Sequence, residues 1–361
     1  MMGENELAAV QTMSQDDLEL MKFIEQSKPR IYVIGAGGSG CNTLSRLHEI
    51  GIQGAKIIAM NTDAQHLVKV RADKKILLGK KLTLGMGAGS NPEVGENAAK
   101  ESKDDIAKSL EDAQLVFVTC GLGGGTGTGS AHVIAEQAKN MGALTVAIVT
   151  LPFTSEGRAR WQNALNGLGK LKRQADTVIV IPNDKLLAIV PDLPLNTAFK
   201  VADEVLANAA KGITELVTKS GLVNLDFADL RTILKDAGCA VIGVGESSLA
   251  EKSDKRAVTA IENALSSPLI EIDIAEANKA LINVVGGADM TLREAEMMVE
   301  EVSKRISPDS HIIWGARIEP DLQKNVLKVL VVIAGAKLPQ YEKMEVVPAG
   351  APADLELDTM L

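Results

Sequence analysis

The residues best suited to chemistry form the run GLGGGTGTG at 121–129, with six glycines and two threonines in nine positions. The run follows the apolar stretch LVFVTC and precedes SAHVIAEQAK, which has a helical pattern. Glycine lets backbone N–H groups approach an anion closely, and the start of a helix favours negative charge. Thr126 and Thr128 add hydroxyl donors. A strand, a glycine-rich turn and a helix start in this order predict a phosphate-binding loop.

Three further segments compete for the same role: GAGGSGCN (35–42), GMGAGSNPEVGENAA (85–99) and IPNDKLL (181–187). The first satisfies G-x-G-x-x-G, and Asp63 follows where a ribose-binding acid would lie. Taken alone, these features favour an NAD-dependent oxidoreductase. Three glycine-rich loops supply more N–H donors than a pyrophosphate needs, and they fit a triphosphate with Mg²⁺ better. Because no GxxxxGK[ST] is present, a P-loop enzyme is excluded.

Alternating apolar runs and helical patterns must position these loops. Nearly continuous Val/Ile runs separated by helices predict an α/β fold with a parallel sheet, and such sheets bind ligands at the carboxyl ends of their strands. The expected strands of the first part are 31–35, 56–60, 115–120, 145–152 and 177–183. A long central helix follows, with Gly221 as its terminating residue. Strands at 239–245, 280–287, 311–318 and 326–336 then predict a second, smaller α/β domain.

Composition excludes several classes of protein. The net charge of −9 argues against a nucleic-acid partner, which would select a basic face. The three cysteines form no CxxC pair and the four histidines lack metal-ligand spacing, so we expect a reducing compartment and no metal held directly by protein side chains. The first residues do not read as a secretion signal, and the longest apolar run is too short to span a bilayer. We therefore expect a cytoplasmic protein without direct membrane insertion.

The motifs in order resemble the FtsZ family, the cell-division GTPases of the tubulin/FtsZ superfamily. GGGTGTG resembles the superfamily signature, and NTDAQ, GAGSNPEVG, PFTSEGRAR, IPNDKLL and GLVNLDFADLRTIL each look like an FtsZ motif. The resemblance runs from about residue 31 to 336. It implies a GTPase that binds GTP or GDP with Mg²⁺, polymerises head to tail with itself and forms the cytokinetic ring at midcell. A tubulin-like scaffold for cell shape remains an alternative, and the oxidoreductase a weaker one.

The resemblance also implies which residues bind the nucleotide. The 35–42 loop would line the phosphates, the 85–99 loop would face the γ-phosphate and the 121–129 run would wrap the α- and β-phosphates. Two further residues would reach the ribose, and three would contact the guanine. In that order they are Gly38, Ser39, Gly40, Cys41 and Asn42; Ala88, Gly89 and Ser90; Gly123, Gly124, Gly125, Thr126, Gly127, Thr128 and Gly129; Glu156 and Arg160; Asn183, Phe199 and Asp203. Asp203 could instead be a solvated helix residue and Phe199 a core ring. Ser39 and Cys41 replace glycines common in the family's first loop, and both are small enough that binding should survive.

Hydrolysis would depend on Asn224, Asp226 and Asp229 in the segment GLVNLDFAD. Two acids three residues apart share a helix face and could orient a water, but Asp226 could equally cap the helix that follows. About two dozen residues of helix separate them from the predicted base site, on the order of 35 Å. If they are catalytic, they must therefore act on the nucleotide of a neighbouring subunit, in a head-to-tail contact that generates filaments.

These expectations give a division of the chain. We expect an N-terminal extension at 1–30 with a short amphipathic helix, a GTP-binding domain at 31–197, a central helix at 198–221, a second domain carrying the catalytic loop at 222–338 and a flexible tail at 339–361. By resemblance, the acidic and apolar tip of the tail would bind a membrane-tethering division protein. The extension and the short linker look more like archaeal members of the family.

Overall fold

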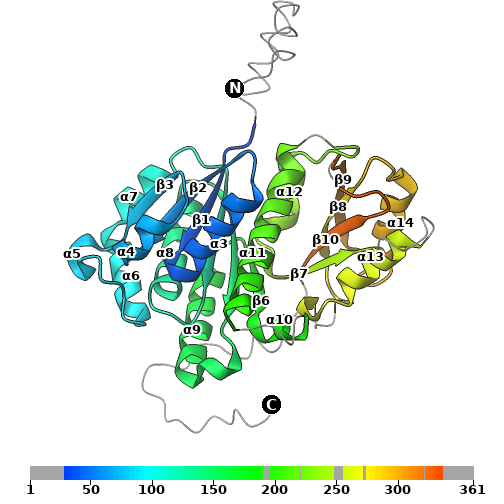
Figure 1. Cartoon of the computed structure of the whole chain (residues 1–361). Helices are drawn as coiled ribbons and strands as arrows, with labels where there is room; N and C mark the ends of the chain where they lie inside the picture. Colours follow the sequence, from blue (N-terminus) through cyan, green and yellow to red (C-terminus); the bar gives the residue numbers. More distant parts are fainter. Residues whose placement is uncertain are drawn as a thin grey trace, which may run out of the picture.

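The computed structural model describes residues 28–189, 195–219, 221–247, 255–270, 274–320 and 322–335. The amphipathic stretch expected near the N-terminus and the tail at 339–361 lie outside the described residues. In the described part, strands and helices alternate from β1 to β6, and the long helix α11 then leads to the second group of strands (Figure 1). The predicted α/β class is confirmed.

All described strands belong to one sheet in the order β3-β2-β1-β4-β5-β6-β7-β10-β8-β9. From β3 to β7 every neighbouring pair is parallel, whereas β10 runs antiparallel to both β7 and β8. The strands are β1 (Ile31–Ala36), β2 (Ala55–Asn61), β3 (Lys74–Leu77), β4 (Leu115–Gly121), β5 (Leu144–Leu151), β6 (Thr177–Pro182), β7 (Gly238–Glu246), β8 (Lys279–Gly286), β9 (His311–Ile318) and β10 (Leu327–Ala334). The carboxyl ends of β1, β4, β5 and β6 therefore meet at one edge.

Helices cover both faces of the first half of this sheet. Apolar side chains of α3, α11 and α12 form one core with one face, and those of α6 to α9 form a second core with the other. The helices are α3 (Gly37–Ile50), α4 (Ala64–Lys69), α5 (Lys80–Thr83), α6 (Pro92–Glu101), α7 (Lys103–Ser109), α8 (Thr126–Asn140), α9 (Arg158–Gln174), α10 (Asn183–Ile189), α11 (Leu195–Thr218), α12 (Phe227–Leu234), α13 (Arg256–Leu265) and α14 (Leu292–Ser303). A third core lies among β7 to β10, α13 and α14.

Two details differ from expectation. The central helix begins at Leu195, three residues earlier than predicted, and ends at Thr218. Gly221 is needed for close packing, because a Cβ there would lie 2.4 Å from the carbonyl oxygen of Ala316 on β9. The second group of strands also continues the first sheet, since β6 pairs with β7 through Thr177–Gly238, Val178–Cys239 and Ile179–Ala240.

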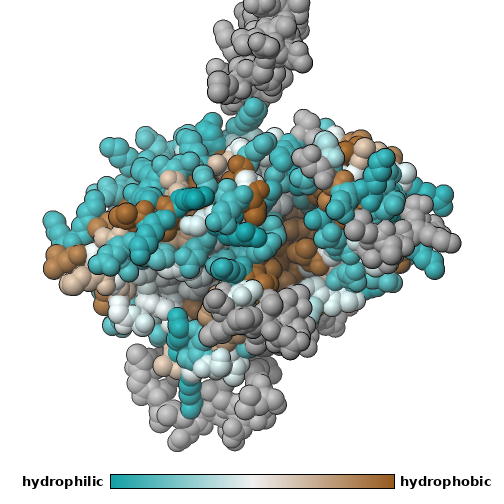
Figure 2. Space-filling model, viewed as in Figure 1, coloured by the Kyte–Doolittle hydropathy of each residue, from teal (hydrophilic) through white to brown (hydrophobic). Residues whose placement is uncertain are grey.

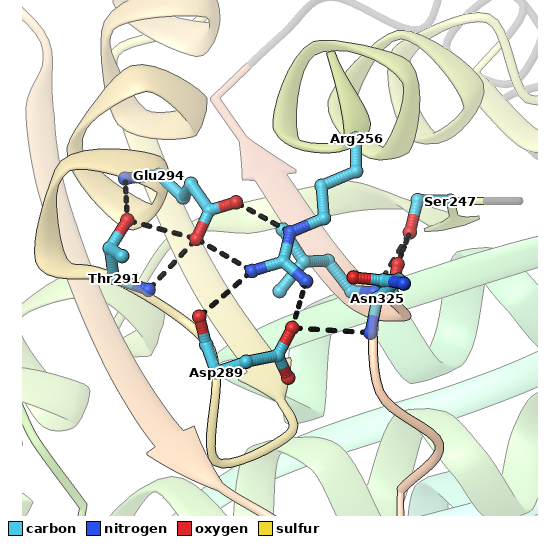
Figure 3. A network of polar contacts seen from close by, with 7 residues as sticks. Ser247, Arg256, Asp289, Thr291, Glu294 and Asn325 are labelled. Carbon is cyan, nitrogen blue, oxygen red and sulfur yellow. Dashed lines mark hydrogen bonds and ion pairs between the residues drawn. The ribbon is translucent and has the colours of Figure 1, made fainter. Parts of the chain in front are cut away.

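A buried arginine ties the second half together (Figure 3). Arg256 at the start of α13 is 1% exposed and reaches Asp289 and Glu294, which lie before and within α14. Its Nη2 donates to Glu294 Oε2 at 2.9 Å. Asp289 also accepts from the backbone N–H of Asn325, just before β10, at 3.2 Å. Buried charges are stable only when paired and hydrogen-bonded, so this network fixes α13, α14 and the start of β10 relative to one another.

Candidate nucleotide-binding site

A cavity of about 370 Å³ lies at the shared edge where β1, β4, β5 and β6 end. Its walls come from the loops after these strands, from the beginning of α3 and α8, and from the second and third turns of α11. The lining residues are Ala36, Gly38, Ser39, Asn42, Gly121, Leu122, Gly124, Gly125, Thr126, Gly127, Thr150, Pro152, Glu156, Arg160, Asn183, Phe199, Ala202 and Asp203. Twelve predicted binding residues thus come together: Gly38, Ser39, Asn42, Gly124, Gly125, Thr126, Gly127, Glu156, Arg160, Asn183, Phe199 and Asp203.

Two helix starts face one end of the cavity. The N-cap residues of α3 and α8 are Ala36 and Gly125, neither of which can offer a side-chain cap, and the first turns carry no acidic residue. The N–H groups of both first turns are therefore left for a ligand. Gly37 has a φ of +74°, and a Cβ there would lie 2.6 Å from the backbone nitrogen of Gly127. Glycine at this position lets the two loops touch, which places both sets of N–H donors side by side.

The two threonines of the glycine run hold the loops to the rest of the fold. Thr126 Oγ1 lies 2.6 Å from Thr62 Oγ1, at the end of β2. Thr128 Oγ1 accepts a 2.8 Å hydrogen bond from the backbone N–H of Gly123, and Thr128 is 2% exposed. Thr126 lines the cavity, whereas Thr128 lies behind it and braces the loop from within.

Eight of the predicted binding residues do not line the cavity in the described structure: Gly40, Cys41, Ala88, Gly89, Ser90, Gly123, Thr128 and Gly129. Gly40 and Gly129 serve packing, because a Cβ would lie 2.3 Å from the Thr119 carbonyl oxygen and 2.0 Å from that of Pro92 respectively. Cys41 points into the core, and burial raises the pKa of its thiol to about 12. Ala88 lies against the end of the cavity that the two helix starts face, since a Cβ on Gly125 would approach Ala88 Cβ to 2.9 Å.

The opposite end of the cavity carries an aromatic ring and a carboxyl group, both from the start of α11. Phe199 is 40% exposed and packs edge-on against the buried Phe153, with ring centroids 5.3 Å apart. It is therefore a supported, accessible ring rather than a core ring. Asp203 accepts a 3.0 Å hydrogen bond from Thr43 Oγ1. Desolvation raises the pKa of Asp203 to about 6 against the opposing effect of that bond.

Two further side chains of the cavity differ in how they are held. Asn183, at the end of β6, is 5% exposed, and its Oδ1 has no hydrogen-bond partner in the described part of the chain. A buried carboxamide oxygen without a partner is costly, which suits a position that a ligand completes. Glu156 is already engaged: its Oε1 accepts from the N–H of Phe153 at 2.8 Å, and its Oε2 pairs with Arg160 Nη1 at 2.6 Å.

The predicted hydrolytic residues lie at the other end of α11. Asp226 is the N-cap of α12 and accepts a 2.8 Å hydrogen bond from the N–H of Asp229, which accepts in return from the N–H of Asp226 at 3.4 Å. Asn224 Oδ1 accepts from the N–H of Gly221 at 2.6 Å. The prediction that Asp226 caps the following helix is therefore confirmed. Figure 1 shows α10 at one end of α11 and α12 at the other, so these residues do not meet the cavity of their own chain.

Six lining residues were not predicted: Ala36, Gly121, Leu122, Thr150, Pro152 and Ala202. Four of them follow from one rule, because Ala36, Gly121, Thr150 and Pro152 lie at or just beyond the carboxyl ends of parallel strands. Leu122 and Ala202 are apolar residues in a loop and a helix, and nothing in their type or spacing indicates a ligand.

Two features are absent from the described part of the chain. No group of three or more His, Cys, Asp or Glu side chains there is arranged to hold a metal ion. Among the same residues, no helix has both the length and the apolar character needed to cross a membrane.

The chain matches two family models: "Tubulin/FtsZ family, GTPase domain" over residues 30–191 and "FtsZ family, C-terminal domain" over residues 238–337. It is 57% identical over 330 residues to Cell division protein FtsZ 1 of Thermococcus kodakarensis, which covers 91% of this chain and 87% of the relative. It is 55% identical over 352 residues to that of Pyrococcus furiosus, covering 97% and 93%.

Solved structures are also similar to this chain. An empty FtsZ dimer from M. jannaschii superposes with a TM-score of 0.86 at 52% identity, covering 94% of this chain and 99% of that one. A GTPγS-bound protofilament of CetZ2 from Haloferax volcanii has a TM-score of 0.75 at 21% identity, covering 87% and 96%, and shows the shared fold alone. These matches replace the oxidoreductase alternative, and the chain belongs to the FtsZ family.

Proposed function

We propose that this chain, an FtsZ-family GTPase that forms filaments in cell division, binds GTP in the cavity at the carboxyl edge of its sheet. The observation that carries the proposal is the convergence of two uncapped helix starts on one end of a cavity whose other end holds Phe199 and Asp203. Phosphates bind to exposed N–H groups at helix starts, and a purine needs an aromatic face with a directional polar partner. The cavity offers both at opposite ends.

The base end favours guanine over adenine. An ionised Asp203 accepts hydrogen bonds from the N1–H and the exocyclic amine of guanine, a pair of donors that adenine does not present in that arrangement. Asn183 Oδ1, buried and unpartnered, is available to a further donor of the base. Phe199 supplies the ring face, and Glu156 and Arg160 border the ribose side.

The phosphate end also defines how the cation binds. The described residues offer no cluster of acidic side chains there. Mg²⁺ commonly binds through substrate phosphates and water with few protein ligands, so we infer that it arrives with GTP. Backbone N–H groups of the loops and this cation would then stabilise the charge on the transferring phosphoryl group. Ala88, Gly89 and Ser90, which lie beside Gly125, would close over the γ-phosphate.

Hydrolysis requires a second subunit. At ~1.5 Å per residue, α11 carries the chain about 22 Å from Asp203 to Thr218 before the loop with Asn224, Asp226 and Asp229 begins. Each carboxylate uses one oxygen in the capping pair, which leaves the other to orient a water. These residues would position the attacking water on the nucleotide of the next subunit, in a heterologous contact that continues into a filament. Loss of the γ-phosphate would weaken that contact.

An apolar surface supports this contact between subunits. Val68, Leu82, Leu84 and Met86 are between 50% and 79% exposed. Figure 2 shows hydrophobic side chains at the left edge, where Figure 1 places α5. Leu82, Leu84 and Met86 lie just before Ala88, which is beside the phosphate end of the cavity. A subunit that approaches the nucleotide would therefore cover these apolar side chains.

The wider cellular assignments rest on the family. We propose the domain boundaries given above, a location in the cytoplasm at the midcell division site, and a membrane-tethering partner for the C-terminal tail. The named relatives are cell division proteins, which supports division over a role in cell shape. Imaging of a tagged copy in dividing cells tests this: a midcell band supports division, and a uniform cortical pattern supports the scaffold.

Turnover at varied protein concentration tests the two-subunit site. Phosphate release per molecule should rise steeply with concentration, together with sedimentable polymer. Asp229→Ala should bind GTP normally, retain polymer and lose most turnover, and it should lower the activity of wild-type protein when mixed with it. A specific activity that is constant on dilution, or an Asp229→Ala protein with the wild-type rate, would refute the assignment. Failure of the purified protein to retain GDP or GTP would refute the nucleotide site itself.

A further inference from the structure

We propose that His66 is a positioning residue for nucleotide binding, which holds the side chain of Asn42 so that its amide nitrogen faces the cavity. The proposal rests on the proposed function, because it assumes that the nucleotide occupies the cavity. His66 does not line the cavity, whereas Asn42 does. His66 Nε2 lies 3.1 Å from Asn42 Oδ1, and this contact joins α4 to α3.

A backbone donor fixes the direction of every bond in this chain of contacts. The N–H of Asp63 can only donate, and it lies 3.3 Å from Asn61 Oδ1. Asn61 must therefore turn its amide nitrogen to His66 Nδ1, at 3.2 Å. Nδ1 then accepts, so the imidazole proton lies on Nε2 and is donated to Asn42 Oδ1. The oxygen of Asn42 is occupied by this bond, and its NH₂ group is left to face the cavity.

The chain of contacts begins in the core, which makes it a rigid support. Asn61 is the last residue of β2 and is 3% exposed. Asp63 is the N-cap of α4, and its carboxylate accepts a 3.0 Å hydrogen bond from the N–H of His66. The cap fixes the position of the His66 backbone at the start of α4. The buried amide of Asn61 fixes the tautomer of the His66 ring. His66 itself is partly exposed, so its replacement removes the relay without opening the core.

The position of Asn42 defines what its NH₂ group would contact. It lies on α3 three residues after Ser39, which borders the phosphate end. It also precedes Thr43, whose hydroxyl donates to Asp203 at the base end. Asn42 is therefore midway along the cavity, where a nucleoside diphosphate or triphosphate presents oxygen acceptors. Without the donor from His66, the amide can rotate and turn its oxygen toward these acceptors, which repels them.

A double-mutant cycle on GDP binding tests the relay, at protein concentrations well below assembly. Wild type, Asn42→Ala, His66→Ala and the double variant are compared in Kd for GDP. Loss of one hydrogen bond to a charged or polar acceptor should raise Kd about fivefold to tenfold for each single variant. If His66 acts through Asn42, the double variant should be no weaker than Asn42→Ala alone. Multiplying effects of the two substitutions would overturn the proposal.

A conservative variant separates positioning from a structural role. Glutamine at position 66 offers a carbonyl oxygen in place of Nδ1 and an NH₂ group in place of Nε2, so His66→Gln should restore most of the affinity lost in His66→Ala. Unfolding midpoints of the nucleotide-free proteins serve as a control and should be unchanged. If wild type binds GDP but Asn42→Ala binds equally well, or glutamine fails to rescue, this inference fails alone. If wild type does not bind GDP, the proposed function fails.

Discussion

The hydroxyl of Thr43 on α3 donates a 3.0 Å hydrogen bond to Asp203 Oδ1 on α11, two residues that are 160 positions apart in the chain. The bond holds the carboxyl group at the wall of the cavity, where desolvation raises its pKa to about 6. A carboxylate kept poorly solvated in the free protein gains more from the two donors of guanine than a hydrated one would. The contact therefore links α3, whose start faces one end of the cavity, to the residue that we propose reads the base.

This raised pKa predicts how GTP affinity depends on pH. Only the ionised Asp203 accepts both guanine donors, so Kd should rise by up to about tenfold for each unit that pH falls below about 6. Asp203→Asn should bind at least tenfold more weakly at neutral pH and should lack this additional slope. Isothermal titration calorimetry of both proteins from pH 5 to 7.5 measures the pH dependence of Kd. The nucleotide's own phosphate titrates equally in both experiments, so its effect cancels in the comparison. Equal slopes of log Kd against pH in the two proteins would show that ionisation of Asp203 does not affect binding of the base.

The same group affects the stability of the nucleotide-free protein. A folded pKa above the unfolded value means that the stabilising contribution is complete below the unfolded pKa and is lost as pH rises through about 6. Asp203→Asn removes this loss, so its melting temperature should exceed that of wild type at pH 7.5, exceed it by less at pH 5 and approach it near pH 4. The free-energy difference is at most about 3 kcal/mol. A difference that stays constant across this range would contradict the assigned pKa.

The capping pair at α12 allows structure and catalysis to be separated. Asp226→Ser keeps an oxygen for the N–H of Asp229 and so keeps the cap, but it removes the carboxylate. Asp226→Ala removes both and should lower the free energy of unfolding by about 1 kcal/mol. If Asp226 positions water, both variants should lose most GTP turnover although only the alanine variant is less stable. Denaturant unfolding measures stability, and phosphate release measures turnover. If the serine variant hydrolyses GTP at the wild-type rate, Asp226 serves only as the helix cap.

Two glycines of the same run should respond differently to alanine. A Cβ on Gly129 would lie 2.0 Å from the Pro92 carbonyl oxygen and 2.5 Å from the backbone nitrogen of Glu96, so α6 and α8 would have to separate. A Cβ on Gly124 would have no atom within 4 Å, although Gly124 lines the cavity. Gly129→Ala should therefore cost about 1–3 kcal/mol of stability. Gly124→Ala should keep the stability of the free protein and weaken GTP binding, as titration and melting would show.

The buried Arg256 network predicts a large effect far from the nucleotide. Arg256→Met leaves the buried carboxylate of Glu294 and the partly exposed one of Asp289 without their partner, and the loss at Glu294 alone should cost about 3–5 kcal/mol. Lys304→Met removes an exposed ion pair with Glu301 and should leave the urea midpoint nearly unchanged. Urea midpoints of both variants measure the difference. Comparable midpoints would show that the arginine network contributes no more than a surface pair.

The fold was predictable where local pattern and burial agree. The nine strands expected from apolar runs are present within one or two residues of their predicted bounds, because strands covered by helices or by a second layer must be nearly continuously apolar. The tenth, Lys74–Leu77, was missed because it is a short edge strand with two lysines, for which the solvated side requires no apolar pattern. The pairing of β6 with β7 is a long-range contact, and no local pattern encodes it.

The candidate site was predictable by residue type but only partly by role. Glycine spacing indicates that backbone must approach something closely, but not what it approaches. Gly124 faces the cavity, whereas Gly40 and Gly129 face neighbouring backbone. Asp226 shows the same limit, since a capping acid and a water-positioning acid have the same sequence pattern. The tautomer of His66 could not be predicted at all, because it depends on three side chains and a backbone amide that only folding brings together.

The bare amides at the two helix starts have a consequence for the cell. The free protein has these unpaired N–H groups and the unpartnered Oδ1 of Asn183, and the guanine nucleotide that we propose for the cavity would satisfy them together. A ligand bound only by the folded form protects it by an amount that grows with the logarithm of ligand concentration. The available pool of guanine nucleotide would thus raise the stability of the folded chain. Starvation that drains the pool would lower the lifetime of the protein as well as the assembly it drives.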